Sequence, residues 1–107
     1  MRTKQVVVVA WQPEWPARFE EIRGALLPAL EGLICGIEHV GSTSVPGLAA
    51  KPIIDLDIVL PDASVFPRVR DALAGLGYRH EGDLGIPGRE AFKYDDKPEL
   101  MTHHLYV

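Results

Sequence analysis

One run of residues constrains the fold of this chain more than any other segment. Across residues 53–60 apolar side chains alternate with Asp55 and Asp57, and Pro61 closes the run. Successive side chains of a β-strand point to opposite faces, so the apolar ones face a core and both carboxylates share the other face. The run therefore predicts a β-strand that lies half-buried on a hydrophobic core.

Two amphipathic helices are predicted from apolar stripes that recur every three or four residues. The stripe of the first helix consists of Trp15, Phe19, Ile22, Leu26 and Leu30. Pro28 is expected to loosen the last turn of this helix, and Gly32 is expected to end it. The second helix is expected to begin at an Asp62 or Ser64 cap. Its stripe consists of Val65, Val69, Leu73 and Leu76.

Further strands are predicted at residues 6–10, 33–40, 78–80, 91–94 and 102–107. The first contains four consecutive valines, which are typical of strands rather than helices. Strands and helices alternate early in the chain, whereas the last three strands are close enough in sequence to be antiparallel neighbours. The order predicts a single α+β domain over residues 1–107, built on a mixed sheet flanked by helices.

Composition supports a folded domain and argues against two other classes of protein. Apolar residues make up 47% of the 107 residues and charged residues 24%, which is too apolar for an intrinsically disordered chain. The 11 Lys and Arg residues are outnumbered by 15 Asp and Glu residues, giving a formal net charge of -4. Without a basic field, long nucleic acid is not an expected partner.

Two features concern the cellular compartment. The early apolar run, residues 6–11, is far shorter than the ~20 residues that span a bilayer, and it is also too short for a signal peptide. We therefore expect no membrane partner and a cytoplasmic location. The single cysteine, Cys35, lies in an apolar run and is expected to be an inert buried thiol rather than a reactive one.

The paired carboxylates Asp55 and Asp57 can do chemistry. Two neighbouring carboxylates repel each other, and this repulsion is costly near a hydrophobic sheet unless water or a cation compensates it. A pair of Mg²⁺ ions ~3.5–4 Å apart would fit such a ledge and clamp a phosphoryl group. The alternative is that the two acids are simply the solvated face of an edge strand.

A polar turn precedes the carboxylates in the sequence. Residues 41–44 read Gly-Ser-Thr-Ser and follow a predicted strand directly. Free backbone N–H groups and three hydroxyls would surround an anion placed there. The spacing fits neither a Walker A loop nor a dinucleotide fingerprint, so an ordinary polar turn is the alternative.

The turn and the carboxylates together resemble the nucleotidyltransferase superfamily, in which Gly-Ser is followed at this sort of distance by Asp-x-Asp on the next strand. More narrowly, residues 38–55 read EHVGSTSVPGLAAKPIID and resemble the signature of the GrpB family. Residues 11–19, 85–89 and 102–105 fit the same family. The resemblance covers essentially the whole chain.

The resemblance implies a nucleotidyltransferase-like fold and assigns roles to specific residues. Gly41 and Ser42 would form the phosphate turn, while Asp55 and Asp57 would be the catalytic and metal-binding carboxylates. The implied cofactors are Mg²⁺ and a nucleoside triphosphate, and the implied partner is a small nucleotide or phosphate-bearing ligand. The family implies no settled substrate.

Further residues are candidates for binding the phosphate or the metal. Thr43 belongs to the expected phosphate turn. Lys51 can reach a phosphate as a point charge or be an ordinary exposed loop residue, and Arg89 can recognise phosphate or form a surface ion pair. His103 and His104 must face opposite ways in a strand, so one is expected to be structural and His104 to be the candidate metal ligand.

The sequence departs from the family pattern in two ways. The family strand usually reads His-His-Leu-His-Val, but Tyr106 stands in place of the last His, and no third carboxylate is evident. Family members also continue into a C-terminal helical segment, whereas this chain stops at Val107. We therefore expect a truncated family domain with one sheet face incompletely covered, which associates with itself.

Two functions of different class follow from the resemblance. One is Mg²⁺-dependent transfer of a nucleotidyl or phosphoryl group to a small acceptor. The other is a non-catalytic nucleotide-binding or folding-accessory role, like that of the domain appended to some dephospho-CoA kinases. Metal-dependent turnover would separate the two.

Overall fold

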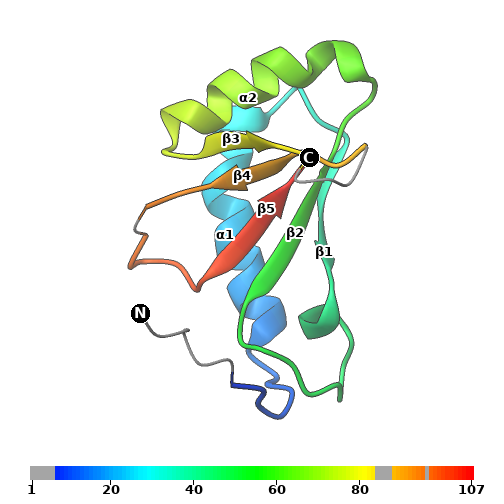
Figure 1. Ribbon diagram of the computed structural model, residues 1–107, viewed down its shortest axis with the longest axis vertical. Coiled ribbons are helices and arrows are strands. Elements are labelled where there is room, and N and C mark those ends of the chain that lie inside the picture. The colour runs from blue at the N-terminus through cyan, green and yellow to red at the C-terminus, as the bar shows by residue number, and fades with distance from the viewer. Residues whose placement is uncertain (1–6, 84–87, 96) are drawn as a thin grey trace.

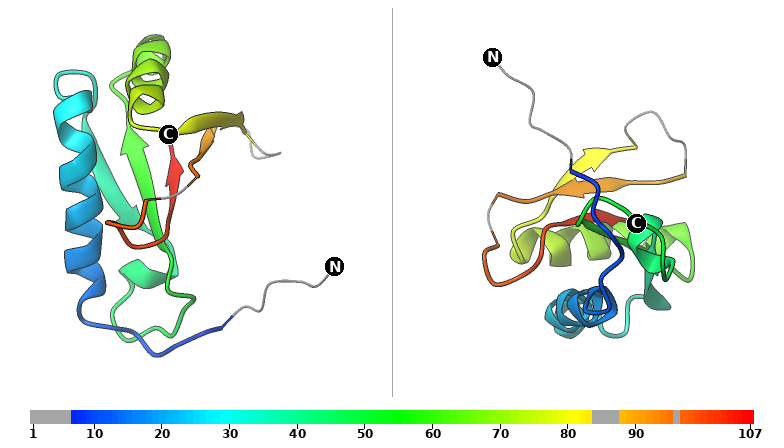
Figure 2. Two further views of the ribbon diagram at one scale, coloured as in Figure 1. Left: turned by 90° about the vertical axis from the view of Figure 1, so that its left-hand side faces the viewer. Right: turned by 90° about the horizontal axis from the view of Figure 1, so that it is seen from below.

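The protein is built as two layers, a sheet and a pair of helices that pack on one of its faces (Figures 1 and 2). The computed structural model describes residues 7–83, 88–95 and 97–107. The helices are α1 (Trp15–Leu30) and α2 (Phe66–Gly75), with short 3₁₀ turns at Ser42–Ser44 and Ala63–Val65. The strands are β1 (Gly36–Val40), β2 (Ile54–Val59), β3 (Arg79–Gly82), β4 (Ala91–Lys93) and β5 (His103–Tyr106).

The sheet has five strands in the order β1-β2-β5-β4-β3. Strand β2 pairs with β5 in parallel, and the other neighbouring pairs are antiparallel. The prediction of a mixed sheet with antiparallel late strands is confirmed. The alternative of an edge strand for the two carboxylates is wrong, because β2 lies between β1 and β5.

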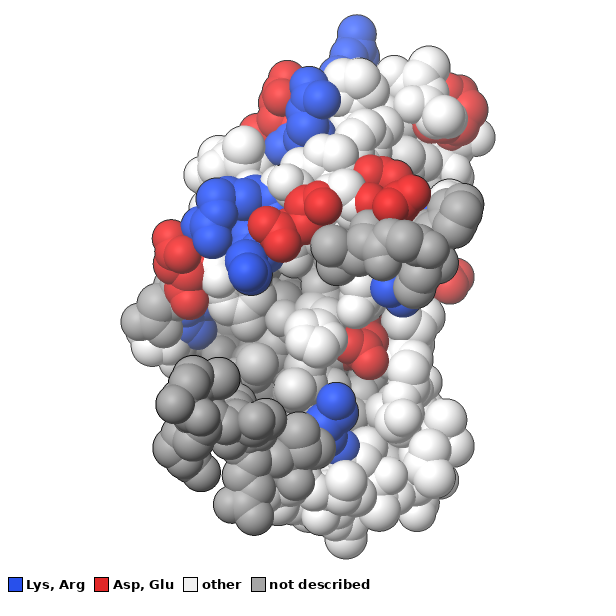
Figure 3. Space-filling view, in the orientation of Figure 1, with Lys and Arg blue, Asp and Glu red and all other residues white. Residues whose placement is uncertain are grey.

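Strand β2 alternates as predicted. Ile54, Leu56 and Ile58 are at most 2% exposed and face the helices, whereas Asp55 and Asp57 are half-buried on the opposite face. The opposite face carries charges of both signs (Figure 3). Both helices lie on the other face of the sheet (Figure 2), and the expected self-association stays a prediction.

Helix α1 follows its predicted stripe, and its five stripe residues are all buried. The helix continues past Pro28 to Leu30, and Gly32 follows it with a positive φ of 83°. Along the described parts of the chain, no helix combines the length and the apolar character needed to cross a membrane.

In α2 the predicted stripe residues Val69 and Leu73 are buried, whereas Val65 and Leu76 flank the helix and are half-buried. Asp62 does not cap α2 as expected but caps the 3₁₀ turn before it, where it accepts a hydrogen bond from the Ser64 backbone N–H.

Two local predictions are wrong. Of the strand expected at residues 6–10, the described part contributes only an isolated bridge between Val9 and Ala50, while Val6 lies outside the described residues. Cys35 is exposed rather than buried. It precedes β1 and donates only its backbone N–H to the Val59 carbonyl, so the apolar run does not continue into the core at this position.

A polar cluster around His103 is buried within the helix-covered layer. His103 is 2% exposed, and its Nδ1 lies 2.8 Å from the Met101 carbonyl while its Nε2 lies 2.7 Å from the Tyr78 hydroxyl. A carbonyl only accepts, so Nδ1 carries the proton and Nε2 accepts from Tyr78. Tyr94 stacks on the same ring at 4.5 Å. The expectation that one of the adjacent histidines is structural is confirmed.

Replacing Trp15 tests the anchor of α1. The side chain is 2% exposed, and truncation of a buried Trp costs about 3–5 kcal/mol, so Trp15→Ala should strongly lower the free energy of unfolding in urea titrations. Leu48→Ala is the control, since Leu48 is 45% exposed and should change stability little. Equal stability of Trp15→Ala and the parent protein would contradict a core role.

The lowered pKa values of two histidines allow a prediction of how the free energy of unfolding depends on pH. Desolvation lowers the pKa of both His39 and His103 below the usual value of about 6.5. The unfolded chain therefore binds more protons in this range, and the free energy of unfolding should fall as pH drops from about 6.5 towards the folded pKa values. Urea titrations across this range should show the slope, and His103→Asn, which keeps an N–H for Met101, should reduce it. A flat profile above the carboxylate range would contradict the prediction.

Candidate functional site

The turn after β1 approaches the first carboxylate of β2 closely. Gly41 adopts φ 76° and ψ -169°, a conformation that is essentially restricted to glycine. A Cβ at this position would overlap Asp55 Oδ2 and lie 3.1 Å from its Cγ. Glycine is therefore needed both for the turn and for the contact between its backbone and Asp55.

Two of the three hydroxyls expected to surround an anion are bonded within the protein instead. Thr43 is 2% exposed, and its hydroxyl lies 2.9 Å from His39 Nε2. The Ser44 hydroxyl donates to the Gly41 carbonyl at 2.6 Å. Of the three, Ser42 has the exposed side chain that lines the neighbouring cavity. The pattern Gly-Ser-Thr-Ser alone does not reveal this division, because the Thr43 hydroxyl bonds to His39 on the strand that leads into the turn.

A small cavity of about 90 Å³ brings together residues from three parts of the chain. It is lined by Ser42, Thr43, Ala50, Lys51, Ile53, Asp55 and His104. A water molecule takes up about 30 Å³ of liquid, so the cavity has room for roughly three waters or one phosphate-sized group. The structure thus brings Lys51 and His104 to the turn and to Asp55.

Asp55 is joined to β5 by an ion pair. The parallel register places it opposite His104, and its Oδ1 lies 3.1 Å from His104 Nδ1. The two side chains are 29% and 51% exposed. Asp55 therefore sits between the turn, the cavity and the strand, with one oxygen directed to His104.

Asp57 has a different environment, although it shares the face of Asp55. Burial raises its pKa above the usual range, Glu38 raises it further, and the Arg89 guanidinium opposes both effects. Glu38 lies directly opposite Asp57 in the antiparallel register with β1. Tyr106 is its neighbour on β5.

Arg89 lies over Tyr106 rather than in the small cavity. Its guanidinium carbon is 4.1 Å from the centre of the Tyr106 ring, and its Nε is buried with no hydrogen-bond partner in the described parts of the chain. Residues 84–87, which belong to the family-like segment before Arg89, lie outside the described residues. The positive charge of Arg89 therefore acts on Asp57 and not in the small cavity.

Glu38 is a site residue that the sequence analysis missed. It supplies a third carboxylate next to Asp57 on the open face of the sheet, which is the face opposite the two helices. The signal was present, because Glu38 alternates with the inward-facing Ile37 and His39. The sequence does not show the strand register that places Glu38 opposite Asp57.

No group of three or more His, Cys, Asp or Glu side chains in residues 7–83, 88–95 and 97–107 is arranged to hold a metal ion. Two carboxylates still suit Mg²⁺, which proteins usually bind with one or two carboxylates while substrate phosphates and waters complete the shell. Asp55 and Asp57 fit that requirement. His104 is bound to Asp55 instead of being a free ligand.

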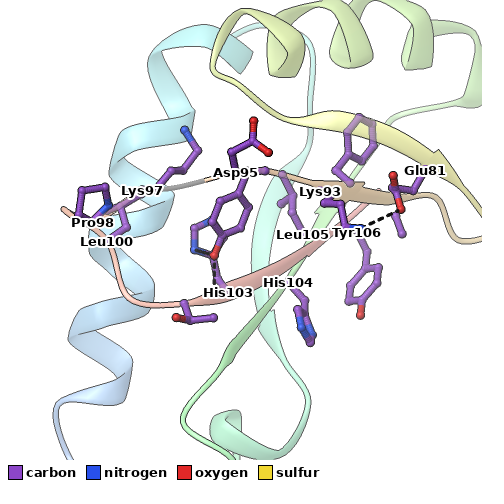
Figure 4. A pocket seen from close by; sticks show the side chains of 14 residues that line it. Glu81, Lys93, Asp95, Lys97, Pro98, Leu100, His103, His104, Leu105 and Tyr106 are labelled. Atoms are coloured by element: carbon purple, nitrogen blue, oxygen red, sulfur yellow. Dashed lines mark hydrogen bonds and ion pairs between the residues drawn. The ribbon is translucent and has the colours of Figure 1, made fainter. Parts of the chain in front are cut away.

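A second, larger cavity adjoins the site on the other side of β5. It has a volume of about 720 Å³ and extends over β3, β4 and the loop before β5 (Figure 4). Lys93 and Glu81 stand together at one side, 4.0 Å apart. His104 lines both cavities, so it marks the boundary between them.

Comparisons with known proteins agree with the sequence signature. The family model described as GrpB protein matches residues 5–107. The UPF0157 protein PA4798 of Pseudomonas aeruginosa is 49% identical over 109 residues, which cover 96% of this chain and 43% of that protein. A dephospho-CoA kinase of Mycolicibacterium paratuberculosis is 34% identical over 76 residues, which cover 68% of this chain and 19% of that protein.

A solved structure supports the same assignment. The crystal structure of conserved protein GrpB from Enterococcus faecalis matches with a TM-score of 0.76 and 36% identity, covering 94% of this chain and 60% of that one. The chain thus spans about half the length of these two GrpB-type relatives. The match over nearly the whole chain, in both sequence and fold, shows that this chain belongs to the GrpB family.

Proposed function

We propose that this domain has a nucleotidyltransferase-like site, which binds a phosphate group of a nucleotide in the small cavity and a divalent cation at Asp55 and Asp57. The observation that carries the proposal is the cavity itself, where Lys51, the Gly-Ser turn and Asp55 meet. Its volume of about 90 Å³ suits a single phosphate group. The rest of the nucleotide would extend out of it.

The acidic residues on the open face favour a cation. Asp57 and Glu38 face each other across β1 and β2, and burial, followed by repulsion from Glu38, raises the pKa of Asp57. A divalent cation would relieve this repulsion, and bound Mg²⁺ would supply charge neutralisation and orientation for a phosphoryl group. The chain would hold the ion through Asp55 and Asp57.

The chain's own groups would orient the phosphate. Gly41 lets the turn lie against Asp55, so that the proposed phosphate and carboxylate sites adjoin. Lys51 offers a positive charge from the opposite wall, and His104 can donate from the β5 side once it leaves Asp55. The reaction we propose is transfer of a nucleotidyl or phosphoryl group to a small acceptor.

A second candidate function is non-catalytic. The relative named dephospho-CoA kinase resembles this chain over 76 residues that make up 19% of that protein. This favours a role as an accessory domain that binds a nucleotide or assists folding without turnover. Tyr106 beside Asp57, in place of the histidine that is usual in the family, points the same way. Turnover of a nucleoside triphosphate that depends on Mg²⁺ would decide for the transferase.

The carboxylates can be tested by charge removal. Asp55→Asn and Asp57→Asn should each weaken binding of ATP in the presence of Mg²⁺ in calorimetric titrations, because the remaining carboxylate cannot hold the cation alone. Thermal melts should change little, or rise for Asp57→Asn, since its repulsion with Glu38 is removed. Asp71→Asn on α2 is the control, because that side chain is 75% exposed and on another element.

Two results would count against the site. Lost stability with unchanged ATP binding in both variants would indicate structural carboxylates. If the parent protein does not bind ATP at millimolar concentration with Mg²⁺, the proposed nucleotide site is wrong. An accessory role that involves no nucleotide would then be the interpretation that is left.

The role of Gly41 can be distinguished from that of a glycine that is needed only for the backbone conformation of a turn. Gly41→Ala and Gly47→Ala both incur backbone strain of about 1–3 kcal/mol, because both glycines have positive φ. Only at Gly41 does the new Cβ meet Asp55, whereas nothing lies within 4 Å of a Cβ at Gly47. We expect Gly41→Ala to lose more stability and to weaken ATP binding, and Gly47→Ala to lose stability alone. Equal ATP binding by the two variants would contradict the role of the close contact.

A further inference from the structure

The segment before α1 touches both walls of the small cavity. Val9 and Ala50 exchange backbone hydrogen bonds, each 2.9 Å long. Two residues later, the Trp11 indole N–H donates to the Thr43 carbonyl at 3.1 Å. Ala50 and Thr43 both line the cavity, but they belong to different segments of the chain. We call these segments the two walls of the cavity: one is the turn at Ser42–Ser44, and the other is Ala50 with Lys51.

Both walls lie outside the regular strands of the sheet. The turn is a short 3₁₀ segment, and Ala50 and Lys51 lie outside β2. Segments held by few contacts open more readily than strands, so their geometry depends on the bonds that do reach them. The His39 ring holds the Thr43 side chain from inside, and Trp11 holds the Thr43 carbonyl from outside.

The segment is itself anchored in the core. Trp11 packs edge-on against the buried Trp15 of α1, with ring centres 6.3 Å apart. In Figure 1 the segment runs below the sheet before it enters α1. Trp11 therefore links the turn, through its hydrogen bond to Thr43, to the buried first residue of α1.

We propose that Trp11 is a positioning residue for the phosphate-binding turn, and that residues 9–11 form a brace that sets the distance between the two walls of the small cavity. The identity of the ligand rests on the function proposed above. The brace itself rests on the bonds to Ala50 and Thr43.

Removing the indole N–H should shift the turn away from its binding geometry. The Thr43 carbonyl would lose its bond, and the turn would populate other arrangements, so that ligand affinity falls by the lost fraction of the competent state. A hydrogen bond of ordinary net strength corresponds to a roughly two- to tenfold effect. We expect ATP with Mg²⁺ to bind about that much more weakly.

Trp11→Phe is the main variant, because it removes the donor and keeps an aromatic ring against Trp15. Binding of ATP with Mg²⁺ is measured by calorimetry, and amide hydrogen exchange is followed at Ser42–Ser44 and Ala50 without ligand. We expect weaker binding, faster exchange in the turn and a nearly unchanged melting temperature. Leu30→Val is the control, because Leu30 is fully buried at the other end of α1; it should lower the melting temperature and leave both other readouts unchanged.

Val9→Pro is a second variant that removes the N–H donated to Ala50 while keeping both tryptophans. It should speed exchange at Ala50 and weaken ATP binding as well. It also keeps the inference testable if Trp11→Phe does not fold.

The outcomes separate the brace from the nucleotide site. Unchanged exchange and unchanged ATP binding in both variants would overturn the brace. A fall in melting temperature with unchanged exchange and binding would also overturn it, because the contacts would then be merely structural. If the parent protein binds no ATP, the proposed function fails, while exchange at the turn and Ala50 still decides the brace: faster exchange supports it and equal exchange overturns it.

Discussion

The parallel pairing of β2 with β5 is the interaction on which the rest of the molecule depends. It sets Leu56 beside Leu105 under the helices, where both are fully buried. The same register sets Asp55 beside His104 on the open face. A slip by one residue would exchange the two faces, so the core and the candidate site are fixed by one register.

Local patterns were enough to predict the elements but not their neighbours. The alternation in β2 and the stripe of α1 each reflect one periodicity, and both match the structure. Pairing between strands far apart in sequence leaves no such local pattern, which is why β2 was open to interpretation as an edge strand and Glu38 was missed. Cys35 shows a related limit, because an apolar run does not say where the chain turns out of the core.

The candidate site could be predicted as a set of residues, but not as a set of contacts. Its Gly-Ser turn, Lys51, Asp55 and His104 do gather around one cavity. The Thr43 hydroxyl turns inward to His39, which composition alone cannot indicate. Hydrogen-bond partners are set by tertiary structure, so the number of groups free to meet a ligand is smaller than the number of polar residues in the motif.

The two carboxylates divide the open face into ends with different chemistry. Asp55 contacts the turn and His104 and lines the small cavity, where we propose that a phosphate binds. Asp57 lies opposite Glu38 and Tyr106, and its pKa is raised by burial and by Glu38 and lowered by the Arg89 guanidinium. A phosphate-binding accessory domain needs only the first end, whereas a transferase needs both.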